Sequence, residues 1–369
     1  GSRRKSIPGS AGFLVSGIIV IIGAALLFDT WPQSEGFGAL AVVALVVTGA
    51  ATAAEFLGGE GWDNLFIVVS VAVPLIVWQT HPGWWPDLGI AAVTAVVFGS
   101  FARRMEYLTI SGAVAGALFA GTLVGLGGWS WVLLGFAFFF LSSALSKIGR
   151  SLKRRTEQAV SGRDRRTEEQ VYANGGIAWI MVVVHAVAPA SHFYWGFLGA
   201  VAAATADTWA SELGPLAARR ARMILSGREV AAGTSGAVSV PGTAAGLLGT
   251  GVIWLAAVIA GAEAFVDVGV PAALVIVVVS GGAGSLVDSV AGATIQAIYR
   301  EEGSGREVES LDEVFGAAAH VRGWQWIDNQ RVNWLCTAAG ALIAIGLGGA
   351  GIACDVRRVI RRWGGYLLY

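Results

Sequence analysis

Two aspartates stand inside long apolar stretches of this sequence, where acidic side chains are costly. Asp207 lies near the end of an apolar segment at 192–210, and Asp288 lies deep within another at 270–298. A carboxylate in or near hydrocarbon is expensive, and such residues are usually paired or functional. A helix-terminal polar cap or an interhelical hydrogen bond is the plain alternative for Asp207, and a buried structural hydrogen bond is the alternative for Asp288. We interpret both residues as candidate functional groups.

Oxygen-bearing side chains accompany both aspartates. Thr208, Ser211 and Glu212 follow Asp207 and would project with it into one arc of a continuing helix. Carboxylates and hydroxyls suit Mg²⁺, which usually takes one or two protein carboxylates together with substrate phosphates. The sequence therefore predicts a Mg²⁺ site formed by Asp207, Glu212 and Asp288, with Thr208, Ser211 and Ser285 as neighbouring ligand-binding residues.

A stretch rich in glycine and hydroxyl residues runs directly into the apolar segment at 242–262. Pro241 suits the first turn of a helix there, and the free N–H groups at such a helix start favour anions. The chain contains no Gly-Lys-Ser/Thr of a Walker A loop, and a flexible turn is the alternative reading. The residues predicted to bind phosphate are Gly233, Thr234, Ser235, Gly236, Ser239, Gly242 and Thr243.

Eight Lys and Arg residues fall within 147–166. Such a cluster beside a membrane commonly attracts anionic lipids, but Arg and Lys are also the usual ligands of phosphate groups. Lys147 and Arg150 would share one helix face. We predict that Lys147 acts with the two aspartates in catalysis and that Arg150 and Lys153 bind phosphate.

Further polar residues lie next to the ends of apolar segments. Asn174 precedes two glycines, and a short polar stretch precedes the last apolar segment. Helix capping is the alternative role for the latter. The sequence predicts phosphate binding by Asn174, Asp328, Asn329 and Asn333.

The elements that must position these residues are membrane helices. Of 369 residues, 55% are hydrophobic and 14% are charged, against about 25% charged residues in soluble domains. Lys+Arg and Asp+Glu are equal at 25 each, which does not favour a nucleic-acid partner. Apolar segments approach the ~20 residues needed to cross a bilayer and lie at 11–28, 37–57, 64–79, 88–101, 108–126, 129–146, 176–188, 192–210, 242–262, 270–298 and 333–353.

These segments predict an all-α, polytopic integral membrane protein with about ten to eleven transmembrane helices. The segment at 176–188 is short and is interpreted as a half-span. Residues 1–100 are expected to form a scaffold or accessory bundle, residues 101–355 a catalytic membrane domain, and residues 356–369 a basic tail.

The distribution of basic residues predicts the orientation in the membrane. Counting along the first ten segments places the basic loops on one side, which the positive-inside rule makes cytoplasmic. We therefore expect a protein of the cell inner membrane with its polar loops in the cytoplasm. The basic loops on that side include those at 147–170, 211–241 and 299–331.

Five segments resemble, in the same order, the integral membrane family catalogued as domain of unknown function 92. They are Asn174-Gly-Gly, Ala206 to Gly214, Gly233 to Ser239, Gly242 to Gly246 and Gly284 to Thr294. The resemblance covers about residues 105–350, and the family includes the plastid phytyl-phosphate kinase of tocopherol synthesis. It implies a Mg²⁺-dependent kinase that transfers a phosphoryl group from a nucleoside triphosphate, CTP in preference to ATP, to a polyprenyl or phytyl monophosphate.

Two other functions remain open at this point. A transporter or flippase of an anionic lipid or small anion would use the same helix ends and carboxylates. A cytidylyltransferase acting on a lipid phosphate would release pyrophosphate from CTP. The expected partners are the lipid bilayer, an isoprenoid or phytyl phosphate and the triphosphate, without nucleic acid; a homo-oligomer is compatible with the sequence.

Overall fold

The computed structural model describes residues 6–29, 31–57, 62–81, 83–155, 165–218, 220–303, 307–311 and 317–349. The predicted basic tail at 356–369 lies outside these residues. Within them, nine helices are long and apolar enough to cross a membrane. The predicted all-α polytopic class is confirmed, and the number of such helices is slightly below the expected ten to eleven.

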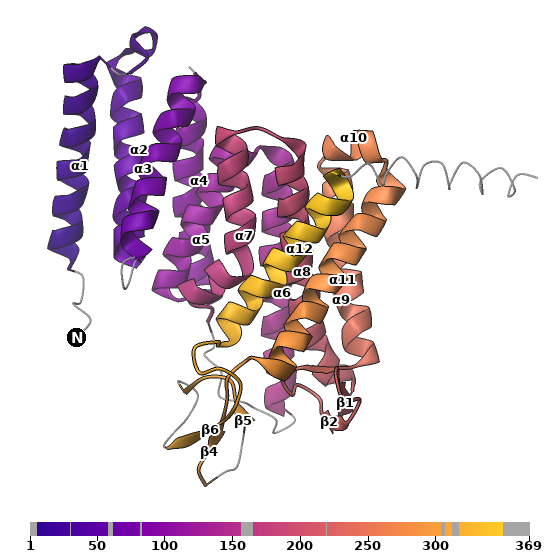
Figure 1. Cartoon of the computed structure of the whole chain (residues 1–369). Coiled ribbons are helices and arrows are strands. Elements are labelled where there is room, and N and C mark those ends of the chain that lie inside the picture. Colours follow the sequence, from indigo (N-terminus) through magenta and orange to yellow (C-terminus); the bar gives the residue numbers. More distant parts are fainter. Residues whose placement is uncertain are drawn as a thin grey trace, which may run out of the picture. The chain divides into compact units, whose positions relative to one another are not determined.

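The chain divides into two compact units, which are described separately (Figure 1). Unit 1 comprises residues 1–128, 165–171 and 182–189, and unit 2 comprises the remainder. The first boundary between these units falls at Gly128, and the functional division predicted at residue 100 stays a prediction. The helices of unit 1 are α1 (Ile7–Phe28), α2 (Gly36–Leu57), α3 (Trp62–Thr80), α4 (Trp85–Arg104) and α5 (Ile110–Thr122), with a π-helical turn at Leu123–Gly127.

Unit 2 holds most of the predicted site residues. Its helices are α6 (Trp129–Arg155), α8 (Ser191–Ala217), α9 (Val240–Ile259), the short α10 (Ala264–Val268), α11 (Val270–Thr294) and α12 (Asn329–Gly349). Helix α7 (Glu168–Val187) contributes residues to both units.

Helix α7 corrects the half-span predicted at 176–188. It is a full helix of 20 residues because it begins eight residues earlier than its apolar part. The side chain of Gln170 accepts a hydrogen bond from the backbone N–H of Thr167 and completes a capping box there. The polar first turns hid this start from a search for apolar segments.

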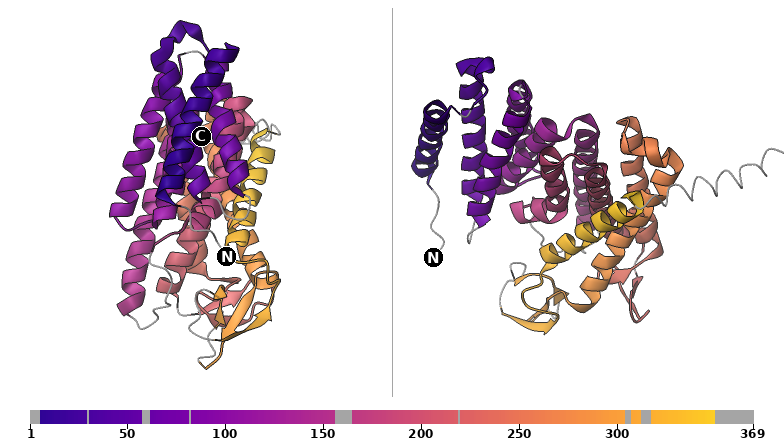
Figure 2. Two further views of the ribbon diagram at one scale, coloured as in Figure 1. Left: turned by 90° about the vertical axis from the view of Figure 1, so that its left-hand side faces the viewer. Right: turned by 45° about the horizontal axis from the view of Figure 1, so that its top comes forward.

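Two small antiparallel sheets, not predicted from the sequence, lie at one end of unit 2, opposite α10 (Figures 1 and 2). The first has the order β2-β1-β3 and follows α8. The second has the order β5-β4-β6 and follows α11. The strands are β1 (Arg220–Met223), β2 (Glu229–Ala231), β3 (Ala237–Val238), β4 (Ile298–Glu301), β5 (Glu307–Val308) and β6 (Ala318–Arg322).

Helix α8 lies at the centre of unit 2, against α9, α11 and α12. Residues 194–206 are buried without interruption and are mainly Ala, Gly and aromatic residues. A Cβ added to Gly340 of α12 would lie 2.5 Å from the carbonyl O of Gly199 in α8. Since lipid gives no hydrophobic drive between helices, such close backbone packing is what holds them together.

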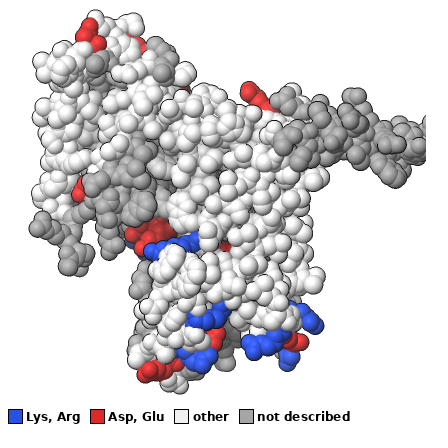
Figure 3. All heavy atoms as spheres, in the orientation of Figure 1, with Lys and Arg blue, Asp and Glu red and all other residues white. Residues whose placement is uncertain are grey.

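Charged side chains of unit 2 lie mostly at the end that carries the strands (Figure 3). They include the exposed arginines 220, 222, 228 and 300. The loops predicted at 211–241 and 299–331 therefore share one end of the unit, as the charge pattern indicated.

Candidate functional site

The carboxyl groups of Asp207 in α8 and Asp288 in α11 lie close enough to act on each other electrostatically. The residues that precede each of them by one turn explain the meeting: a Cβ added to Gly284 would lie 2.5 Å from the Cβ of Ala203. Glycine at 284 lets the two helices touch, and the next turn of each helix carries the aspartate.

The electrostatic neighbours of this pair are themselves acidic. Asp207 and Asp288 act on each other, and Glu309, just after β5, acts on both. Oδ1 of Asp288 is buried and has no hydrogen-bond partner among the described residues. Ionised carboxylates only accept hydrogen bonds, and two of them side by side repel each other. Binding of a proton or a cation between the two carboxyl groups would therefore reduce their repulsion.

The thiol of Cys336 in α12 lies beside the same pair. Its Sγ contacts the carbonyl O of Ala203 at 3.8 Å, and both aspartates act on it electrostatically. Three helices therefore meet directly next to the carboxyl groups. Asn333 lies one turn before Cys336 and Thr337 and is buried in the same helix.

Glu212, predicted as the third metal ligand, packs elsewhere. A Cβ added to Gly149 would lie 2.9 Å from its Oε2, so this carboxylate lies against α6. Among the described residues, no three His, Cys, Asp or Glu side chains come close enough to hold a metal ion together. The structure thus supports a two-carboxylate arrangement and does not bring Glu212 into it. The reason is the 140° between positions 207 and 212 on a helix, which aims them at different neighbours.

The hydroxyl residues near the aspartates make local contacts. The Ser211 hydroxyl donates to the carbonyl O of Thr208 at 3.1 Å. Ser285 is half-buried, and its carbonyl O accepts from the Ser289 hydroxyl at 3.2 Å. The side chains of Thr208 and Ser285 remain candidates for ligand contact on the faces of α8 and α11.

The predicted phosphate loop lies on the last turn of α11. The Ser235 hydroxyl donates to Oε1 of Gln296 at 3.0 Å. A Cβ added to Gly292 would lie 2.9 Å from Oγ of Ser235 and 3.0 Å from the N of Gly236. Since Gly292 follows Asp288 by one turn, the structure brings the loop and the carboxyl pair together on one helix. Gly233 and Gly236 both have positive φ, at 89° and 79°, which glycine adopts without strain.

Ser239 begins helix α9, as the glycine- and proline-rich sequence predicted. Its Oγ accepts from the N–H of Gly242 at 3.2 Å, and Pro241 occupies the first turn. Gly242 is buried against α8, where a Cβ would lie 3.2 Å from the carbonyl O of Ala210. The start of α9 therefore lies against the α8 segment between Asp207 and Gly214.

Replacing Ser239 by Ala is expected to lower the free energy of unfolding by about 1 kcal/mol, because one N–H at the start of α9 loses its partner. Thermal unfolding of the purified protein measures this loss. The exposed Thr243 is the matched control, and Thr243→Ala should leave the midpoint unchanged or slightly raised, because alanine is the better helix former. If the unfolding midpoint of Ser239→Ala equals that of wild type, Ser239 does not stabilise the start of α9 as a cap.

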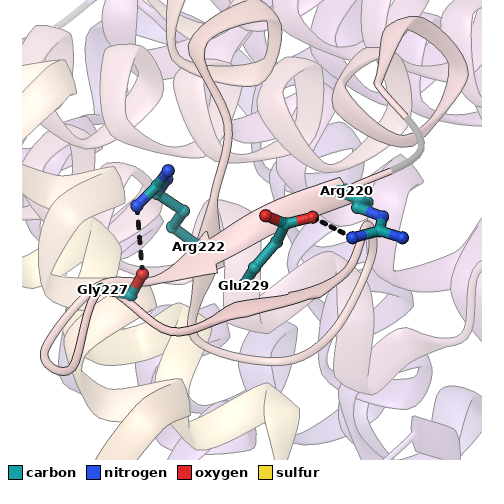
Figure 4. Close-up of polar contacts among 4 residues, drawn as sticks. All are labelled: Arg220, Arg222, Gly227 and Glu229. Atoms are coloured by element: carbon teal, nitrogen blue, oxygen red, sulfur yellow. Dashed lines mark hydrogen bonds and ion pairs between the residues drawn. The ribbon is translucent and has the colours of Figure 1, made fainter.

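The basic residues lie on different elements. Lys147 is exposed on α6, whereas the side chains of Arg150 and Lys153 lie outside the described residues. In the β1–β2 hairpin, Arg220 forms an ion pair with Glu229, and Arg222 donates to the carbonyl O of Gly227 (Figure 4). The hydrogen bond from Arg220 holds the pKa of Glu229 below its usual value.

The remaining predicted residues take structural positions. Asp328 accepts from the N–H of Arg331 at 2.9 Å and pairs with its guanidinium, which is the capping role left open for this stretch. Asn329 is the first residue of α12. Asn174 is half-buried on α7, next to Ala173, whose carbonyl O lies 3.4 Å from the hydroxyl of Thr337.

The sequence profile described as "Integral membrane protein DUF92" matches residues 93–341. The chain belongs to this family. The matched range contains Asp207, Asp288, the 233–243 loop and both small sheets. The resemblance stated from the five segments is thereby confirmed.

The chain is also similar to three individual proteins. The chain is 31% identical to Protein PGR of Arabidopsis thaliana over 237 residues, which cover 59% of this chain and 81% of that protein. It is 24% identical to the uncharacterized membrane protein MJ0933 of Methanocaldococcus jannaschii over 261 residues, covering 70% and 93%. It is 27% identical to the uncharacterized membrane protein sll0875 of Synechocystis over 274 residues, covering 72% and 94%. No solved structure matches the chain.

Two further residues lie near the carboxyl pair and the 233–239 loop, namely Glu309 and Arg322. The sequence did not identify either of them as a site residue. Both belong to the polar stretch after α11, whose strands are two to five residues long. Alternation over so few residues carries no reliable strand signal. The stretch joins the end of α11 to the start of α12. These two helix ends were the only sequence signal that the stretch lies close to the site.

Proposed function

We propose that this chain is a membrane-embedded kinase that transfers a phosphoryl group from a nucleoside triphosphate, CTP in preference, to a polyprenyl or phytyl monophosphate. The observation that carries the proposal is the pair of carboxyl groups from Asp207 and Asp288, with acidic Glu309 as its further electrostatic neighbour. The resemblance of five segments to a family that includes a phytyl-phosphate kinase supports the same chemistry.

The donor set fits Mg²⁺. Two facing carboxylates and an unpartnered buried oxygen of Asp288 provide hard oxygen ligands, and Mg²⁺ typically takes one or two carboxylates, with water and phosphate completing its shell. When bound, Mg²⁺ would neutralise negative charge on the carboxylates and on the phosphates of both substrates. Asp207 and Asp288 would hold it, without Glu212.

The other groups would orient the substrates. The loop at 233–239 and the start of α9 offer N–H and hydroxyl groups for phosphate oxygens, and Lys147 supplies positive charge from α6. The lipid tail would lie between helices, and the strand-bearing end of unit 2 would face the cytoplasm. The acceptor phosphate forms the new P–O bond as the nucleoside diphosphate leaves, so no protein nucleophile is required.

The test incubates purified protein with Mg²⁺, CTP or ATP and a series of prenyl and phytyl monophosphates. Formation of prenyl diphosphate and nucleoside diphosphate in equal amounts is expected, with loss of both on chelation of Mg²⁺. Release of pyrophosphate with a CMP-lipid product would identify a cytidylyltransferase instead. If no acceptor in the series yields a product that depends on the triphosphate, the kinase proposal is wrong.

One observation favours a second function. The half-buried carboxyl groups of Asp207 and Asp288 act on each other within membrane helices, and such groups serve as proton relays in transporters. We therefore also consider proton-coupled transport of an anionic lipid or small anion. Reconstituted liposomes with an imposed pH gradient would show flux of the anion without triphosphate, and no such flux would be expected of the kinase.

A further inference from the structure

Arg322, the last residue of strand β6, is bonded to both the 233–239 loop and helix α11. Its Nη1 donates to the carbonyl O of Gly292 at 2.7 Å, and its Nη2 donates to the carbonyl O of Ser235 at 3.3 Å. The side chain is half-buried. Both bonds are charge-assisted and reach backbone acceptors, so they fix the path of the chain at each end.

Capping of α11 explains only one of these two bonds. The carbonyl of Gly292 belongs to the last turn of α11, where carbonyls lack partners within the helix and basic side chains commonly bind them. The bond to Ser235 has no part in capping. It ties a loop that precedes Arg322 by 87 residues in the chain to the same guanidinium.

Two further contacts lie next to the bonds of Arg322, and both involve Gln296. Gly323, directly after Arg322, has a φ of 80°, and a Cβ there would overlap the backbone of Gln296. Gln296 is 1% exposed, and its Oε1 accepts from the Ser235 hydroxyl. Its Nε2 is buried without a partner among the described residues. An unpaired buried donor is costly, so Gln296 adds no slack to this junction of α11 and the loop.

We propose that Arg322 is a positioning residue that holds the 233–239 loop on α11, one helical turn from Asp288, so that a phosphate ligand meets loop and carboxyl pair in a fixed arrangement. Preorganised donors lower the cost of ordering the site when the phosphate binds. The nature of the ligand rests on the proposed kinase function, whereas the Arg322 contact can be tested without it.

Hydrogen exchange of the intact protein in nanodiscs tests this contact. The peptide covering residues 231–238 is followed, where the N–H of Ala237 donates to the carbonyl O of Thr234 at 3.0 Å. Arg322→Gln is expected to speed its exchange by about tenfold, as the loss of charge-assisted hydrogen bonds predicts. Arg322→Lys should give a smaller rise. The control is Arg300→Gln, which removes an exposed cation of β4 that pairs with Glu307.

A second variant covers the case in which Arg322→Gln unfolds the whole β4–β6 sheet. Gly292→Ala leaves Arg322 in place but adds a methyl group 2.9 Å from Oγ of Ser235. It is expected to speed exchange in residues 231–238 and to leave the sheet protected. Loop exchange equal to wild type in Gly292→Ala, or equal in Arg322→Gln and Arg300→Gln, would overturn the proposal.

Kinetics separates this inference from the proposed function. If triphosphate-dependent turnover is found, Arg322→Gln should raise the KM for the triphosphate about tenfold with a smaller change in kcat, and Arg322→Lys should restore part of it. A fall in kcat alone would contradict a positioning role. If no turnover is found with wild type, the kinase proposal fails, and the exchange experiment still decides the role of Arg322.

Discussion

Asp207→Asn and Asp288→Asn are each expected to lower triphosphate-dependent turnover by about 100-fold or more, the order seen when one electrostatic contact to a transition state is removed. The double variant should be little worse than either single variant, because residues that act as a unit are not additive. Product formation by purified protein at saturating Mg²⁺ measures this loss.

The same variants are expected to unfold at or above the wild-type temperature. Each replaces one of two facing carboxyl groups that have acidic Glu309 nearby, which relieves repulsion and lowers the cost of burial. Loss of activity together with a fall in stability would indicate a structural hydrogen bond instead. Glu263→Gln is the matched control, since Glu263 is exposed between α9 and α10 at the opposite end of unit 2 and should change neither property.

Gly340→Ala is expected to destabilise the protein by about 3 kcal/mol, at the upper end of the usual cost of overpacking. The added Cβ would lie 2.5 Å from the carbonyl O of Gly199 and 2.6 Å from the Cβ of Ala203. The first of these is backbone, which cannot rotate away, so α8 and α12 must separate. Thermal unfolding in detergent should show a lower midpoint by several degrees.

Gly346→Ala provides the comparison within the same helix. A Cβ at Gly346 meets nothing within 4 Å, and alanine is the better helix former. Its unfolding midpoint should equal or exceed that of wild type. Equal midpoints for the two variants would mean that α8 and α12 do not pack as closely as described.

The sequence revealed the carboxyl pair because an acid in an apolar segment stands out on composition alone. The helical class and the approximate positions of the apolar helices also followed from the sequence, whereas several helix ends differ by four to nine residues from the predicted ones. The sequence could not show that Asp207 faces α11 while Glu212 faces α6, because that depends on which neighbour lies on each side of α8. Helix periodicity gives relative angles along one helix and carries no information on its neighbours.

The two small sheets could not be predicted from hydrophobic patterns in the sequence. Their strands are short and lie within polar loops, and the residues that matter, Glu309 and Arg322, resemble ordinary surface charges in the sequence. Their importance comes from the chain's return to the ends of α8 and α11. Only long-range contacts such as that between Arg322 and Ser235 make it visible.

Helix α8 carries Asp207 yet is absent from the nine helices of the described chain that meet the length and hydropathy of a membrane span. It packs against α6, which is synthesised before it, but mostly against α9, α11 and α12, which are synthesised after it. On its own, α8 is therefore a poor candidate for partition into lipid as it leaves the ribosome. Its stable insertion should await the later helices, and a nascent chain that ends before Asn329 should leave α8 accessible to a water-soluble thiol reagent at an engineered cysteine such as Ala203→Cys.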